Sequence, residues 1–204
     1  MITIGLIGGI AAGKSTAAAM LAERGATVIT GDTEAHALYA PGTDGYETII
    51  EAFGQSILAE DGHIDRRILG SIIFNDSEAR QLLNDIMWPL ARQRFIDLKT
   101  QYEEADCKVL VIEAAVLLDA GCQDLVSEIW VVTAAENVRA ERLSKRSGLS
   151  GPESEVRIRA QKSVELFAEE LKGFPIIEID SGGTVEEFEA GVDKEWQSLL
   201  GRLG

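Results

Sequence analysis

The sequence predicts an α/β fold, with five parallel β-strands in one sheet between layers of helices. Five short apolar runs are spaced along the chain, and they are continuous rather than alternating, which indicates strands buried on both faces. Helical patterns separate them, as expected when parallel strands are joined by helices. The length of 204 residues fits a single domain over residues 1–204. We therefore expect a three-layer sandwich built on one sheet.

Each predicted element follows from its local composition. The strand candidates are rich in Ile and Val, and they cover residues 2–7, 27–30, 108–113, 128–133 and 175–179. The helix candidates contain strong helix formers or end near capping residues, and they cover residues 14–24, 45–53, 65–73, 78–104, 135–147, 153–171 and 184–201.

The segment 33–104 contains no strand candidate. We interpret it as a helical insertion over the carboxyl edge of the sheet, where open α/β folds bind their substrates. Residues 1–32 and 105–204 then form the core. Within the long helical pattern of 78–104, Trp88-Pro89 predicts a break, because proline lacks an N–H donor and disfavours helix at the residue before it.

The charge balance limits the choice of partners. The chain carries 34 acidic and 19 basic residues, a formal net charge of -15, which argues against nucleic acid and anionic membranes as partners. No run of 18 apolar residues occurs. The two cysteines lack metal or scaffold spacing, so we expect reduced thiols in a cytoplasmic protein. We also expect a monomer or weak oligomer. A small anionic substrate requires locally concentrated positive charge.

The strongest motif follows the first predicted strand. Residues 8–15, GGIAAGKS, fit the phosphate-binding loop (P-loop) pattern GxxxxGK[ST], and a helix follows at once. In such a loop the backbone amides surround phosphate oxygens, the lysine neutralises the β- and γ-phosphates, and the hydroxyl completes a Mg²⁺ shell. The predicted nucleotide-binding residues are Gly9, Ile10, Ala11, Ala12, Gly13, Lys14, Ser15 and Thr16, with Ser15 as the metal ligand.

Two further features favour a small-molecule kinase over the other P-loop classes. The guanine-reading NKxD of GTPases is absent, and a large ATPase needs a longer chain. Asp32 follows the second strand, where a carboxylate can accept the proton of an attacking hydroxyl. The alternative, which stays open at this stage, makes Asp32 the N-cap of a helix over 33–39.

The second feature is a basic cluster at 139–162, interpreted as a mobile lid. Seven of the 19 basic residues lie there, and three of the arginines share one helical face; the cluster comprises Arg139, Arg142, Lys145, Arg146, Arg157, Arg159 and Lys162. Such a face can stabilise charge on a transferring phosphoryl group. The alternative is a solvated helix with salt bridges to Glu136 and Glu141.

Together these residues resemble the dephospho-CoA kinase family over nearly the whole chain. The opening GLIGGIAAGKST is similar to the family's GLTGGIGSGKST, with Ala11 and Ala12 in place of Gly and Ser. The pair Gly31-Asp32, the run DGHIDRR from residue 61 and EAAVLLD from residue 113 continue the match, which is closest in pattern to the kinase half of bifunctional CoA synthase. Three departures are Thr30 for the first Asp of the family's DAD, Trp88-Pro89 for its His-Pro pair, and Asp180-Ser181-Gly182 for its asparagine-glycine near the C-terminus, which lies near adenine.

The resemblance implies ATP-dependent phosphorylation of the ribose 3′-hydroxyl of dephospho-CoA, with Mg²⁺. It makes Asp32 the catalytic base and Lys14 a catalytic and ATP-binding residue. It implies that Arg142 closes over the phosphates, that Arg146 belongs to the same lid and that Arg66 meets a substrate phosphate.

Three further positions keep two interpretations each. Glu113 either holds a metal-bound water or is a cap or surface residue. His36 either tunes Asp32 at the substrate or packs, and Trp88 either lines the substrate groove or belongs to the core. A P-loop kinase of another small alcohol or nucleoside, and a nucleotide-binding regulator without catalysis, remain as alternative functions.

Overall fold

A five-stranded parallel sheet forms the centre of the computed structural model, which describes residues 1–114, 117–159, 171 and 173–203. All five predicted strands are confirmed, each to within a residue or so at its ends. They are β1 (Ile2–Gly8), β2 (Thr27–Thr30), β3 (Val109–Glu113), β4 (Glu128–Thr133) and β5 (Ile176–Asp180), in the order β2-β3-β1-β4-β5. This order places β1 at the centre, so the loop that follows it lies between the ends of β3 and β4.

Apart from α2, which the sequence predicts only in the N-cap alternative for Asp32, the helices follow the predicted ranges. They are α1 (Lys14–Glu23), α2 (Gly31–Leu38), α3 (Asp44–Phe53), α4 (Arg66–Asn75), α5 (Ser77–Glu104), α6 (Glu136–Ser147), α7 (Gly151–Arg159) and α9 (Val185–Leu200). Of the helix predicted over 153–171, the first part lies in α7, and residues 160–170 are outside the described residues. None of the helices in the described part of the chain is long and apolar enough to cross a membrane.

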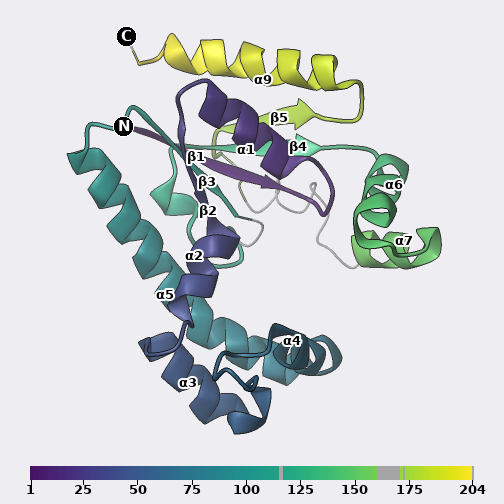
Figure 1. Cartoon of the computed structure of the whole chain (residues 1–204). Helices are drawn as coiled ribbons and strands as arrows, with labels where there is room; N and C mark the ends of the chain where they lie inside the picture. Colours follow the sequence, from purple (N-terminus) through teal and green to yellow (C-terminus); the bar gives the residue numbers. More distant parts are fainter. Residues whose placement is uncertain (115–116, 160–170, 172, 204) are drawn as a thin grey trace.

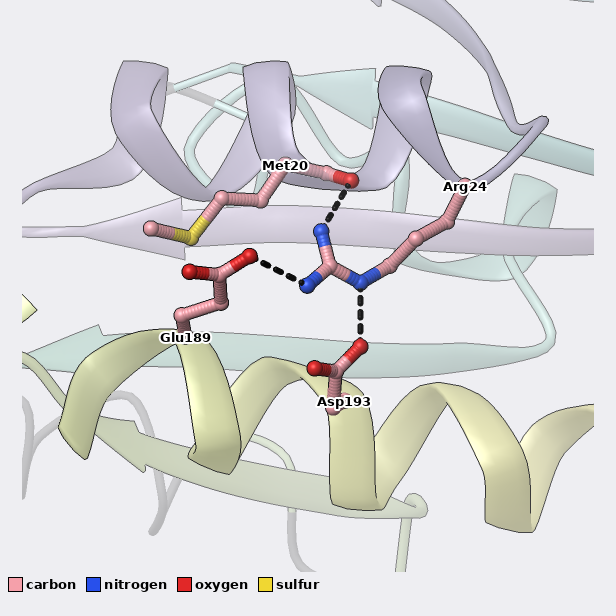
Figure 2. A network of polar contacts seen from close by, with 4 residues as sticks. All are labelled: Met20, Arg24, Glu189 and Asp193. Carbon is pink, nitrogen blue, oxygen red and sulfur yellow. Dashed lines mark hydrogen bonds and ion pairs between the residues drawn. The ribbon is translucent and has the colours of Figure 1, made fainter. Parts of the chain in front are cut away.

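Helices α1 and α9 cover one face of the sheet (Figure 1). Their apolar side chains interlock with those of the strands in one cluster, in which Leu21, Trp130 and Leu199 are fully buried. At the end of α1, the Arg24 guanidinium donates to Asp193 at 2.5 Å and to Glu189 at 3.1 Å, both on α9 (Figure 2). The helix that begins in the P-loop is thus tied to α9 by apolar packing and by two ion pairs.

The opposite face of the sheet is covered by the second half of α5. Phe95 and Leu98 pack there against strand residues such as Leu110 and Ile112 in a second cluster. The first half of α5 runs past the sheet to α3 and α4 (Figure 1), with which it encloses a third cluster around Ile49 and Leu69. Segment 33–104 is therefore helical as predicted, with one isolated bridge, Leu58 to Ile64.

The predicted break at Trp88-Pro89 is wrong, because α5 continues without interruption from Ser77 to Glu104. Proline removes one hydrogen bond of the helix and crowds the preceding turn, which costs about 3 kcal/mol in a helix interior. Leu83, Ile86 and Met87 pack into the third cluster, whereas Trp88 and residues after Pro89 pack into the second, so apolar burial on both sides holds the two halves in one helix.

Candidate functional site

The P-loop takes the backbone conformations that a phosphate cradle requires. Gly13 caps α1 with φ 99° and ψ 14°, a left-handed conformation that suits glycine. Ala11, two residues earlier, has φ 57°, which is unfavourable for a residue with a Cβ atom. The loop and the start of α1 line a cavity of about 200 Å³, whose walls include Gly13, Lys14 and Ser15.

Lys14 lies back against its own loop. Its Nζ donates to the carbonyl oxygen of Gly8 at 3.1 Å. Burial lowers the pKa of this ammonium, while the carboxylates of Glu113 and Asp32 act in the opposite direction. Both acidic side chains therefore lie close enough to Lys14 to stabilise its charge, as the sequence interpretation of Lys14 and Asp32 requires.

Ser15 and Glu113 meet at the centre of the carboxyl edge. The Ser15 hydroxyl donates to Glu113 Oε1 at 3.0 Å, joining the start of α1 to the last residue of β3. Glu113 is only 9% exposed, so a surface role for it is wrong, and it ends a strand rather than capping a helix. A hydroxyl beside a carboxylate is an oxygen donor set that suits Mg²⁺, which binds one or two protein oxygens and completes its shell with phosphates and water.

Asp32 lies in the first turn of α2 and is exposed. The helix begins at Gly31 with Thr30 as its N-cap, so the alternative in which Asp32 is the N-cap is wrong. A Cβ atom on Gly31 would lie 2.7 Å from the Cβ of Ala114. This glycine thus lets the start of α2 approach the end of β3, which brings Asp32 near Lys14.

The predicted substrate residues His36 and Arg66 share one electrostatic environment with Asp32. Burial lowers the pKa of His36, Arg66 lowers it further, and Asp32 acts in the opposite direction. The His36 ring makes an edge-to-face contact with Tyr39, with ring centroids 5.7 Å apart. Arg66, at the start of α4, is exposed, so its guanidinium is free to meet a ligand.

Trp88 is placed differently from those residues. Its half-buried side chain packs against the apolar cluster between α5 and the sheet. The packing interpretation of Trp88 is therefore met, and no described contact joins Trp88 to Asp32, His36 or Arg66.

The arginines of α6 face the P-loop from the side opposite α2. Arg139 Nε donates to the Ile10 carbonyl oxygen at 3.1 Å, and its guanidinium lies over Gly9, where a Cβ atom would be 2.7 Å from Cζ. Arg142 and Arg146 line the cavity of about 200 Å³ at the P-loop described above. Positive charge is thus concentrated on the loop despite the acidic composition of the chain.

Two of the other basic residues of the predicted lid fit the alternative of a solvated helix with salt bridges. Lys145 pairs with Glu141 at 2.6 Å and Arg159 with Glu136 at 2.8 Å, the surface salt bridges of the solvated-helix alternative. Arg157 is exposed on α7, and Lys162 lies outside the described residues. Within the described part of the lid, it is therefore α6 that places arginines at the loop.

Ser181 is a contact that sequence reasoning missed. Its hydroxyl lies between Arg142 and the P-loop, and both bonds join residues that are distant in the sequence. The sequence offered two signals, namely its position directly after a predicted strand and its place in the 180–182 departure from the family pattern, but neither of them indicated these partners. A second cavity of about 230 Å³ opens beside it and shares Gly13, Thr16 and Arg142 with the first.

The fold and the site together define the class of P-loop kinases. Strand β1 leads into a GxxxxGK[ST] loop, one carboxylate ends β3, another follows β2, and arginines from the helix after β4 cover the loop. This combination is the machinery for positioning and neutralising a transferring phosphoryl group.

Comparisons with known proteins narrow the class to one family. The family model for dephospho-CoA kinase matches residues 2–170. Dephospho-CoA kinase of Moorella thermoacetica is 43% identical over 207 residues, covering all of this chain and 94% of the relative, and that of Geobacter sulfurreducens is 41% identical, covering 96% and 98%. The chain belongs to the dephospho-CoA kinase family.

A solved structure agrees with this assignment at the level of the fold. Dephospho-CoA kinase from Campylobacter jejuni superimposes with a TM-score of 0.71 at 22% identity, covering 97% of this chain and 96% of the other. The parallel sheet with its helical layers is therefore the fold of a known P-loop kinase.

Proposed function

We propose that this protein transfers the γ-phosphoryl group of ATP to the ribose 3′-hydroxyl of dephospho-CoA. The observation that carries the proposal is the contact between Ser15 and Glu113, in which the Ser15 hydroxyl, next to Lys14, donates to Glu113 Oε1 at 3.0 Å. Asp32 follows β2 at the same edge of the sheet, and this arrangement supports an acceptor base and a metal-side carboxylate near the phosphate-binding lysine. In the reaction a bond forms between the 3′-oxygen and the γ-phosphorus, the bond to the bridging oxygen of ADP breaks, and the hydroxyl proton passes to Asp32.

The two cavities beside the loop divide the nucleotide between them. The one lined by Gly13, Lys14 and Ser15 takes the phosphates, with Arg142 and Arg146 supplying positive charge at its rim. The adjoining one, lined by Thr184, Val185 and Phe188 among others, takes the base, since an aromatic and an aliphatic wall suit a flat ring. Lys14 must leave the Gly8 carbonyl oxygen to reach the β- and γ-phosphates.

Mg²⁺ is part of the proposal. Ser15 would hold the ion directly and Glu113 would hold it through the Ser15 hydroxyl or a water molecule. When bound, the ion neutralises negative charge on the phosphates. Among the described residues no cluster of three or more His, Cys, Asp or Glu could hold a metal independently, which fits a site completed by the phosphates of ATP.

The acceptor would bind on the side of α2 and α4. Arg66, exposed at the start of α4, would meet a phosphate of dephospho-CoA. Burial lowers the pKa of His36, Arg66 lowers it further and Asp32 acts in the opposite direction, which supports a shared substrate-binding surface. On this proposal the chain is one kinase domain, with 33–104 as the substrate-binding arm and 139–162 as the lid. Both cysteines are free thiols, which is consistent with the proposed cytoplasmic location. The proposed oligomeric state is a monomer or weak oligomer.

The decisive experiment is a coupled assay of ADP release with a panel of acceptors. Dephospho-CoA should stimulate release strongly, while nucleosides and small alcohols should not. In Asp32→Asn the turnover number should fall at least about 100-fold, the usual scale for a general base, with ATP affinity unchanged.

Glu186→Gln is the matched control. Glu186 is also an exposed carboxylate in the first turn of a helix, so this variant reports any general effect of removing such a charge. It should keep wild-type turnover. No ADP release above the background without acceptor would overturn the proposed acceptor, and near-normal turnover of Asp32→Asn would overturn the role of Asp32.

A further inference from the structure

Ser181 occupies a buried position between the P-loop and α6. It follows β5 directly, and its backbone N–H donates to the carbonyl oxygen of Thr133 at 2.8 Å, which anchors it to the end of β4. Only 1% of the residue is exposed. A buried hydroxyl at the carboxyl edge of a parallel sheet needs hydrogen-bond partners, because burial without them costs free energy.

Its partners are the P-loop backbone and the arginine of the proposed lid. The Ser181 hydroxyl donates to the carbonyl oxygen of Ala12 at 2.6 Å. It accepts from Arg142 Nη1 at 2.9 Å, while the Ser181 carbonyl oxygen accepts from Arg142 Nη2 at 2.5 Å. Because a hydroxyl has one proton, the direction of this chain is fixed: Arg142 donates to Ser181, and Ser181 donates to the loop.

The bond to Ala12 orients an amide of the phosphate cradle. A peptide unit is planar and trans, so its carbonyl and its N–H point in opposite directions. With the Ala12 carbonyl held toward Ser181, the N–H of Gly13 points away from Ser181. Gly13 also lies against this hydroxyl, since a Cβ atom there would be 3.2 Å from Ser181 Oγ.

The bonds to Arg142 fix a charge at the junction of two cavities. Arg142 lines both the cavity at the P-loop and the second cavity beside Ser181. Two of its five N–H groups donate to Ser181. Because the guanidinium is planar, holding two of its N–H groups also fixes the plane of its remaining donors. This is the advantage of arginine over lysine in binding phosphate.

We propose that Ser181 is a positioning residue, which holds the Arg142 guanidinium and the Ala12–Gly13 peptide in the geometry that receives the phosphates of ATP. This inference rests on the proposed function, in which ATP occupies that loop. It adds to the nucleotide site a residue from the β5–α9 connection, which acts through Arg142 and the Ala12–Gly13 peptide.

The test is a double-mutant cycle on ATP affinity, measured by calorimetry without acceptor. The variants are Ser181→Ala, Arg142→Met and the two combined. Ser181→Ala should weaken ATP binding about 10-fold, the scale of one hydrogen bond to a charged group. Because Ser181 acts partly through Arg142, the combined variant should lose clearly less than the product of the two single effects.

Steady-state kinetics supply a second reading. In Ser181→Ala the kcat/KM for ATP should fall about 10-fold, while the KM for dephospho-CoA should stay within about 2-fold of wild type. Ser181→Cys is nearly isosteric and a poorer hydrogen-bond partner, so it should shift ATP affinity in the same direction even if the alanine variant does not fold.

Thr3→Val is the matched control. The Thr3 hydroxyl is also buried, at 1% exposure of the residue, and finds no hydrogen-bond partner among the residues the structure describes. It lies in β1 away from the loop, so this variant should bind ATP as wild type does.

Two results would overturn the inference: unchanged ATP affinity in folded Ser181→Ala and Ser181→Cys, or full additivity in the cycle. If dephospho-CoA instead failed to stimulate ADP release by the wild type, the proposed acceptor would fail, and the affinity cycle would still decide the role of Ser181.

Discussion

Ala11 holds the P-loop backbone in the left-handed region, at φ 57°. In this conformation the Cβ atom crowds the following carbonyl oxygen, at a cost of roughly 1–2 kcal/mol for an L-residue. The resemblance to the family motif places glycine at this position, and glycine has no such cost. Ala11 therefore stores strain in the loop that must bind ATP.

Replacing this residue should relieve the strain. Ala11→Gly should raise the free energy of unfolding by about 0.5–1 kcal/mol, because the relief exceeds the added entropy of the unfolded chain. Urea denaturation followed by circular dichroism measures the change. Ala12→Gly is the control: Ala12 is buried without a positive φ, so its replacement should lower stability. Equal loss in both variants would contradict the interpretation.

At this scale the sequence predicted the groups that are local in the chain. The eight-residue motif places Lys14 and Ser15 correctly because the loop and the helix after it are short-range structure. The partner of Ser15 is 98 residues away, and Ser181 is 169 residues from Ala12. Those contacts depend on strand order and on the packing of α6, neither of which leaves a pattern in the sequence around Glu113 or Ser181.

Among the elements, α1 and α9 depend on each other through Arg24. Its bond to Asp193 keeps the pKa of that carboxyl below its ordinary value. A lowered native pKa means that the pair stabilises the fold above the ordinary carboxyl pKa of 3.8, and that this contribution is lost as the pH falls through the native pKa.

Asp193→Asn should therefore be slightly less stable than wild type at pH 7, and the difference should close below pH 3.8. Because the carboxylate is half-exposed, the effect is expected to be small and to shrink in high salt. Urea midpoints at several pH values measure it. Glu23→Gln, which removes the neighbouring carboxylate on α1, should show no such pH-dependent loss, and a constant difference at every pH would contradict the ion-pair explanation.

Helix α5 shows why local rules could not decide every element. Pro89 predicts a break from chain chemistry alone, and the prediction fails because two separate apolar clusters hold the flanking halves. The sequence does contain the apolar residues of both clusters, such as Leu83 and Phe95. Which face each of them meets is determined only once the sheet and the helices α3 and α4 are assembled.

For the whole molecule, the surplus of acid and the affinity for phosphate are compatible because charge is distributed unevenly. Lys14, Arg139, Arg142 and Arg146 surround the loop, while acidic side chains populate α9 and other exposed surfaces. The net charge predicts that extended polyanions are poor partners, and it carries no information about a small anion bound in a local cluster of positive charge.

Binding of both substrates should close the molecule over the loop. We expect α6 and α7 on one side, and α2 to α4 on the other, to gain hydrogen-exchange protection when ATP and dephospho-CoA are present together, since closure excludes water and suppresses ATP hydrolysis. Peptides from the second half of α9 should show unchanged protection. Identical exchange of the lid and arm helices with and without the ligands would contradict closure.

The continuous helix α5 could transmit this closing motion between the sheet and the helices α3 and α4. At 1.5 Å per residue its 28 residues span about 42 Å, and it is anchored to the sheet at one end and to α3 and α4 at the other. It can act as a lever arm whose small tilt at the sheet becomes a larger displacement of the distal helices. Because Pro89 lacks a hydrogen-bond donor between the two anchored halves, we expect any bending of that arm to occur at its turn.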